Sequence, residues 1–220
     1  FLFVLISGRV DEIIKSKFSD KSLVSEIQRN FGDIRIIIPY AISILLLPIV
    51  ALINTFNALV NEINSGSLRY LVNRTKRSYI YIAKLLSEIT YTNIAILFSF
   101  LLIVIFLSIK GDISFGYFSY ALLPLLVLFL YSSSFISLFL MINTFSKNQF
   151  SSLFYCLMSI SLLILFMQFN ILKYISIFYY VPDIGNETLS NLLLKILGFL
   201  TFIILTSLLG IHFFKRRSLW

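Results

Sequence analysis

The feature that most constrains this chain is a series of long apolar runs that contain almost no charged residue. One run, residues 36–60, reads IIIPYAISILLLPIVALINTFNALV, and comparable runs recur further along the chain. A helix needs about 20 consecutive apolar residues to cross the hydrocarbon core of a bilayer. Only 13% of the 220 residues are charged, against about 25% in a soluble domain. The sequence therefore predicts an all-α, polytopic integral membrane protein.

Five complete spans are predicted, and together they form a single transmembrane domain. Their approximate ranges are 36–60, 89–109, 117–143, 150–171 and 192–214. Pro39 and Pro48 lie inside the first span, where neighbouring helices can compensate for the lost hydrogen bonds. The run FLFVLIS, residues 1–7, is too short to cross a membrane. We interpret it as the end of a further helix whose beginning is absent, which gives six transmembrane helices.

Polar segments separate these spans. Residues 8–35 contain six basic and five acidic residues among apolar ones, which indicates an external segment with one or two short surface helices. Residues 172–194 combine Tyr and Phe with a Pro-Gly turn, which is typical of external helices at the membrane interface. Asn186 begins a glycosylation sequence there, and its use depends on the host.

The positions of Lys and Arg predict the orientation, because cytoplasmic loops are enriched in these residues. Among the later loops, nine bases lie on the side of residues 61–86 and the C-terminus, and three lie on the other side. This distribution favours a cytoplasmic position for residues 61–86. The six bases of residues 8–35 count against that orientation and bring the totals level.

The formal net charge of +8 does not indicate a nucleic-acid partner. The bases lie between and after apolar spans, where they set the topology and meet anionic lipid headgroups. We therefore expect contact with membrane lipid and none with nucleic acid.

The sequence offers few groups for catalysis or metal binding. It contains no G-x-x-x-x-G-K-[ST], no H-E-x-x-H and no G-x-S-x-G pattern. Cys156 and His212 are the single residues of their types, so one chain can form neither a disulfide nor a cluster of such ligands. We expect both to be packing or lipid-facing residues. The chain is predicted not to be an enzyme by itself and to hold no cofactor or metal.

The interiors of the spans, away from their ends, carry no Asp, Glu, Lys, Arg or His. Ion-coupled transporters usually carry at least one ionisable group within the membrane. This argues against a secondary transporter, although Asn93, Ser134, Gln168 and Asn170 could line a polar path. Any driving energy is expected to come from a partner.

Residues 61–77, NEINSGSLRYLVNRTKR, form a basic stretch between two apolar spans. Leu68, Leu71 and Val72 share one face at the period of a helix. Gly66-Ser67 predicts a turn before that helix, with Ser67 as its candidate cap. On these residues alone, a short helix that binds a partner and a loop that only anchors the topology are equally supported.

The longer segment NEINSGSLRYLVNRTKRSYIYIAKLL resembles the signature of ABC-2 type transporter permeases. The matching positions are Glu62, Gly66, Ser67, Leu68, Leu71, Arg77 and Lys84-Leu85-Leu86. The terminal FFKRRSL, residues 213–219, is similar to the basic cluster after the last helix of this family. The chain departs from the signature at Ser67, where the family has Thr, at Ala83, where it has Gly, and in lacking the usual Pro before the Arg.

This resemblance implies the permease subunit of an ABC exporter with six transmembrane helices. Residues 61–86 would hold a coupling helix that docks on a separate ABC ATPase subunit, which binds the ATP and Mg²⁺. A second permease, either a copy of this chain or a related one, would complete a dimer. The residues then expected to contact the ATPase are Glu62, Gly66, Leu68, Arg69, Leu71, Arg74, Arg77 and Lys84.

The cargo is expected to be hydrophobic or amphipathic, because the spans are apolar and uncharged. The Ile-, Lys-, Asn- and Tyr-rich composition is typical of AT-rich prokaryotic genomes, which places the protein in a prokaryotic plasma membrane. The alternative is a non-transporting immunity, scaffold or sensor subunit that holds a cytoplasmic partner through the basic loop. An adjacent ATPase gene would favour the exporter.

Overall fold

The computed structural model describes residues 34–109, 115–182 and 189–217. The predicted helix end at residues 1–7, most of the segment 8–35 and Asn186 lie outside the described residues. Within the described ranges the chain forms helices and turns and no strand. Five of these helices are long and apolar enough to cross a membrane. The predicted all-α, polytopic fold is therefore confirmed.

The described elements occur in this order along the chain: α3 (Ile34–Thr55), α4 (Val60–Asn64), α5 (Ser67–Val72), α6 (Arg77–Ile109), α7 (Phe115–Asn143), α8 (Gln149–Phe166), η1 (Leu172–Ile175), η2 (Ile177–Tyr180) and α9 (Leu189–Arg216). α6 begins well before the predicted span 89–109, because its polar first turns are helical as well. α8 ends at Phe166, short of the predicted residue 171.

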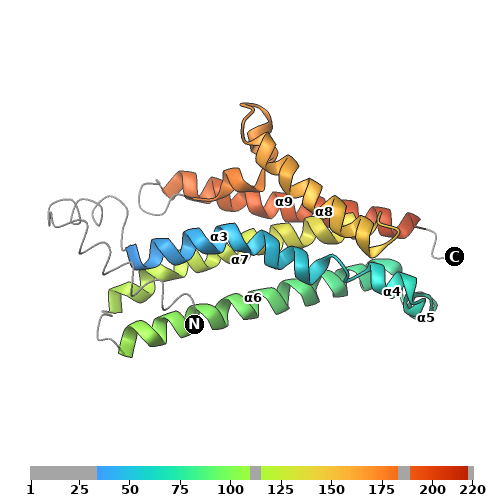
Figure 1. The fold of residues 1–220 in the computed structure, drawn as a ribbon, viewed down its shortest axis with the longest axis horizontal. Coiled ribbons are helices and arrows are strands. Elements are labelled where there is room, and N and C mark those ends of the chain that lie inside the picture. Colours follow the sequence, from blue (N-terminus) through green and yellow to red (C-terminus); the bar gives the residue numbers. More distant parts are fainter. Residues whose placement is uncertain (1–33, 110–114, 183–188, 218–220) are drawn as a thin grey trace.

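α7 forms the centre of the bundle and packs against α3, α6 and α9 (Figure 1). Its buried apolar side chains are Val127, Leu128, Tyr131, Phe135, Ile136, Phe139 and Leu140. Hydroxyl groups join it to its neighbours: Ser137 pairs with Thr206 of α9 at 2.8 Å, and Ser132 donates to Asn93 of α6 at 3.0 Å. Such bonds satisfy polar groups inside an apolar bundle. Asn93 thus takes part in helix packing.

η1 and η2 fold back against the bundle as two short 3-10 turns. Ser176 donates to the carbonyl of Leu163 at 2.9 Å, and the Phe178 ring packs against Phe135 with 5.6 Å between centroids. The ring of Tyr180 lies over Gly198 of α9, where a Cβ atom would come within 2.2 Å of it. These contacts hold the two short 3-10 helices onto α7, α8 and α9, and short helical pieces are what the sequence predicted in this segment.

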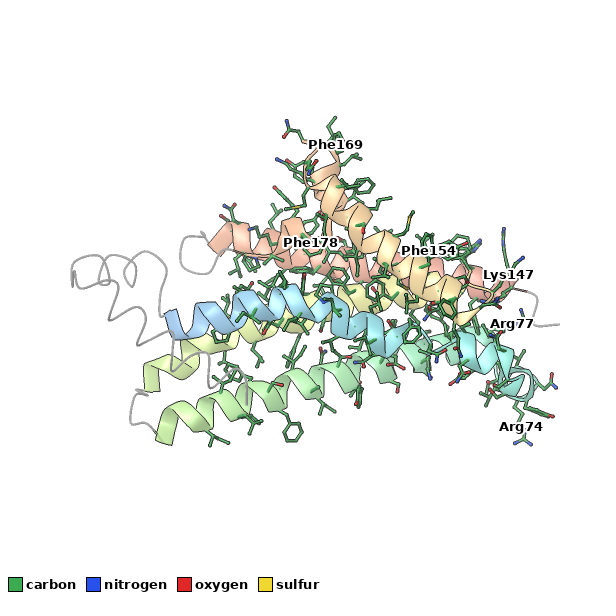
Figure 2. All side chains as sticks on the ribbon, in the orientation of Figure 1. Arg74, Arg77, Lys147, Phe154, Phe169 and Phe178 are labelled. Atoms are coloured by element: carbon green, nitrogen blue, oxygen red, sulfur yellow. The ribbon has the colours of Figure 1, made fainter. Side chains whose placement is uncertain are left out.

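α8 leaves the other helices at a steep angle (Figure 1). Its beginning is fixed by a capping box between Asn148 and Ser151. Phe169, just beyond its end, lies at the tip farthest from the bundle (Figure 2). α8 therefore contacts the bundle mainly through its first half and through the returning η1 and η2.

α6 and α9 approach closely at Gly210. A Cβ atom at this position would lie 2.0 Å from the hydroxyl oxygen of Tyr81. Tyr81 is fully buried, and its ring packs against Phe214 with 6.0 Å between centroids. The missing side chain at residue 210 therefore sets how closely the two helices pack.

Candidate functional site at the basic end of the bundle

Several segments that are far apart in the sequence meet at one end of the bundle. Figure 1 shows α4, α5 and the C-terminal end of α9 together, and Figure 2 places Arg74, Arg77 and Lys147 at the same end. We call this region the basic end. The bases from these segments are Arg69, Arg74, Lys76, Arg77, Lys84, Lys147, Lys215, Arg216 and Arg217. These are the nine bases that the sequence placed on a common side.

α4 and α5 form a helical elbow, residues 60–72, with Gly66 at its corner. Gly66 has a φ of 74°, in the left-handed region that favours glycine. The predicted turn is therefore confirmed. The predicted cap at Ser67 is wrong, because Gly66 holds the N-cap position and Ser67 is the first helical residue. The Ser67 hydroxyl instead donates backwards to the carbonyl of Glu62 at 3.1 Å and closes the end of α4.

The predicted apolar face of α5 divides into a buried and an exposed part. Leu68 is 1% exposed and belongs to the hydrophobic core, whereas Leu71 is 47% exposed. Leu68 anchors the elbow in this structure, because the first turn of α5 faces the core and the second does not, and its contact with an ATPase remains a prediction. Tyr70 is 79% exposed next to Leu71. Tyr70 was not among the residues predicted to contact a partner, although its aromatic side chain on a short basic helix could have suggested it.

Lys84 joins the elbow to α6. Its Nζ lies 2.9 Å from Oε1 of Glu62 on α4 and 3.9 Å from Oε1 of Glu88 one turn further along α6. The three side chains are partly buried, with 26%, 35% and 16% exposure for Lys84, Glu62 and Glu88. Partial burial strengthens such a pair relative to a fully exposed one. Lys84 and Glu62 contact each other, and contact of either with an ATPase remains a prediction.

Arg77, the first residue of α6, holds the end of α9. Its Nη1 donates to the carbonyl of Lys215 at 3.0 Å and to that of Arg217 at 2.7 Å. The last carbonyls of a helix have no partner within the helix, and a cation there is favourable. In this structure the Arg77 side chain therefore binds the end of α9 in its own chain.

Arg217 holds the end of α7 in the same way. Its Nη1 donates to the carbonyls of Asn143 at 3.0 Å and Thr144 at 2.8 Å, and its Nη2 donates to Ser146 at 2.6 Å. Burial lowers the pKa of the Arg217 guanidinium from its usual value. The residue still remains charged, because arginine is not deprotonated in proteins. The sequence analysis placed Arg217 only in the terminal basic cluster.

Asn143 extends these contacts to α3 and α8. The residue is fully buried; its Nδ2 donates to the carbonyl of Thr55, and its Oδ1 accepts from the hydroxyl of Ser152. The same hydroxyl lies 2.8 Å from the carbonyl of Phe56. The ends of α3 and α7 and the beginning of α8 therefore meet at one amide side chain.

The remaining predicted site residues lie on or after the elbow. Arg69 belongs to α5, and Arg74 is exposed in the turn between α5 and α6. In the described ranges, no group of His, Cys, Asp and Glu could hold a metal ion. Contact of Arg69 and Arg74 with a partner remains a prediction.

Replacing Lys84 with Met is expected to loosen the elbow, because Glu62 and Glu88 then lose their shared cation. We expect hydrogen exchange of the amides in residues 60–72 to accelerate about two- to fivefold, since a partly exposed pair contributes up to about 1 kcal/mol. Exchange measured by mass spectrometry checks this. Lys76→Met, at an exposed position near the elbow, is the matched control, and equal acceleration in both variants would contradict the role of Lys84.

Comparison with known proteins gives one clear result. The family model described as ABC-2 family transporter protein matches residues 3–209. The matched range contains the elbow, Lys84 and most of α9. No curated protein and no solved structure matches the chain significantly.

Proposed function

Because the chain belongs to the ABC-2 transporter family, we propose that it is the permease of an ATP-driven exporter whose ATP is hydrolysed by a separate subunit. The chain is a multi-pass membrane protein and a transport component. The export direction, the coupling to ATP and the cargo are the parts that we propose.

The observation that carries the proposal is the exposed second turn of the elbow. Tyr70 and Leu71 are 79% and 47% exposed, and the neighbouring Arg74 and Lys76 are exposed bases. Within the elbow, α5 follows the corner at Gly66 and lies between the candidate spans Pro39–Asn64 and Arg77–Ile103, so this exposed turn is outside both spans. An exposed aromatic and aliphatic pair with a polar rim is typical of a protein–protein contact.

The elbow is also suited to receive a movement. Leu68 and the Glu62–Lys84 pair attach it to the bundle and to α6. A displacement of the elbow by a partner that closes around ATP would therefore move the beginning of α6. The ATP and Mg²⁺ would be bound by that partner, because this sequence carries no phosphate-binding loop.

In the proposed arrangement the basic end faces the cytoplasm, as the enrichment of Lys and Arg in cytoplasmic loops favours. Two permeases, either identical or related, would act together in a prokaryotic plasma membrane. The apolar surfaces of the spans suit a hydrophobic or amphipathic cargo.

The proposal is tested by purifying the tagged chain from its native membranes in mild detergent. We expect an ATPase subunit to co-purify in a stoichiometric amount and to hydrolyse ATP. An unrelated membrane protein with the same tag is the control. A folded, inserted chain without any ATPase would refute the exporter and favour a non-transporting subunit that holds another cytoplasmic partner.

A further inference from the structure

We propose that Arg77 and Arg217 are positioning residues that transmit movement of the elbow to α9 and α7. This inference rests on the proposed function and deepens it. It assigns to both residues a role inside the chain, where the sequence analysis expected Arg77 to contact the ATPase and gave Arg217 no separate role.

The first step of the transmission joins the elbow to α6. Leu68 of α5 is buried in the core, and Lys84 on α6 binds Glu62 on α4 at 2.9 Å. The elbow is thus attached to the hydrophobic core by Leu68 and to α6 by the ionic contact. A force on α5 therefore acts directly on the first turns of α6.

The second step joins the beginning of α6 to the end of α9. The two carbonyls that Arg77 binds are 138 and 140 residues away in the sequence, at Lys215 and Arg217. Arg77 is the first residue of α6, so it moves with the turn that leads out of the elbow. The close approach of Tyr81 to Gly210 prevents the two helices from moving nearer to each other at that point.

The third step joins the end of α9 to the end of α7. The guanidinium of Arg217 binds the carbonyls of Asn143, Thr144 and Ser146 through two nitrogens. A planar, forked guanidinium can hold three carbonyls in a fixed orientation, whereas the single ammonium of lysine cannot reproduce this geometry. The third of these contacts is the shortest, at 2.6 Å.

The last step passes the movement from α7 to α3 and α8. Asn143 at the end of α7 also contacts the carbonyl of Thr55 at the end of α3 and the hydroxyl of Ser152 in α8. The described spans are thereby linked at the basic end through consecutive contacts that begin at the elbow. Chains of packed side chains and hydrogen bonds of this kind can carry coupling between distant parts of a protein when they have two arrangements.

The experiment compares Arg77→Gln and Arg217→Gln, each in the complex with the co-purified ATPase in lipid nanodiscs. The matched controls are Lys215→Gln and Arg216→Gln, which remove the same charge from exposed neighbours of Arg217 and keep the backbone carbonyl that Arg77 binds. Three quantities are measured: the amount of bound ATPase, the rate of ATP hydrolysis, and the change in hydrogen exchange on adding ATP and Mg²⁺ in residues 60–72 and 140–148.

We expect both test variants to bind the ATPase normally and to keep the ATP-dependent change in residues 60–72. The ATP-dependent change in hydrogen exchange of residues 140–148 should disappear. The rate of ATP hydrolysis should fall by about fivefold or more, because allosteric coupling typically changes an equilibrium by at least that factor. Arg217→Lys should behave like Arg217→Gln, because the fork is lost, and it serves as the test variant if Arg217→Gln does not fold. The controls should resemble the unchanged chain.

Two outcomes would overturn the inference, and they are distinguishable. If the unchanged chain binds no ATPase, the inference and the proposed function both fail. If the ATPase binds and the test variants still transmit the ATP-dependent change to residues 140–148, the inference fails alone. If Arg77 and Arg217 only stabilised the fold, their replacement would lower the thermal stability. The ATP-dependent changes in hydrogen exchange of residues 60–72 and 140–148 would then be affected alike.

Discussion

Replacing Tyr70 and Leu71 together with Asp is expected to abolish co-purification of the ATPase while the chain remains folded and inserted. Both side chains are largely exposed in the isolated chain, at 79% and 47%. Their replacement therefore removes little packing from the fold, and surface substitutions of this kind usually change stability by less than about 0.5 kcal/mol. A central interface residue contributes about 2 kcal/mol or more, which weakens binding about thirtyfold at each position.

The measurement is the ratio of ATPase to permease after purification from membranes. The matched control is Asn64→Asp with Asn73→Asp, because both residues are exposed, one in the elbow and one directly after it, and gain the same negative charge without loss of apolar surface. Arg77 stays unchanged in both variants, since it binds the end of α9. If the test variant and the control retained equal amounts of ATPase, the result would contradict a docking role of the elbow.

Replacing Gly210 with Val is expected to destabilise the whole bundle. Any Cβ atom at this position meets the hydroxyl oxygen of Tyr81 at 2.0 Å and its Cζ at 2.5 Å, and Tyr81 is fully buried. Overpacking of this kind costs about 1–3 kcal/mol. For a chain of this size, we expect the thermal unfolding midpoint to fall by roughly 5 °C or more.

The midpoint is measured by size-exclusion chromatography of the detergent-solubilised protein after heating. Leu209→Val, at the neighbouring exposed position of α9, is the control and should change the midpoint little. Combining Gly210→Val with Tyr81→Leu should recover part of the loss, because the shorter side chain leaves room for the valine. A double variant no more stable than Gly210→Val would show that another contact causes the loss.

The sequence was sufficient to predict the helical membrane fold, because apolar runs of this length have few other solutions. It could not predict where the helices end. Hydropathy detects the most apolar part of α6, but the more polar turns from Arg77 onwards are helical as well. It also could not predict that α8 ends at Phe166 before the polar Gln168 and Asn170.

The position of the candidate site could be predicted from the sequence. The role of each residue in it could be predicted only in part. The turn at Gly66 followed from local residue preferences, which depend on neighbouring residues only. The burial of Leu68 and the exposure of Leu71 depend on which turn of α5 meets the core. The bonds from Arg77 to the end of α9 join residues 138 and 140 positions apart. No periodic pattern in a single sequence records contacts of that kind.

The steep inclination of α8 has a consequence for the surrounding lipid. α8 has 18 residues, a rise of about 27 Å, which is shorter than a hydrocarbon core of about 30 Å even without inclination. α6 has 33 residues, a rise of about 50 Å. The candidate span within α6, Arg77–Ile103, is still nine residues longer than that of α8, and a bilayer accommodates a short span by thinning. We therefore expect the lipid along α8 to be thinner than the lipid along α6.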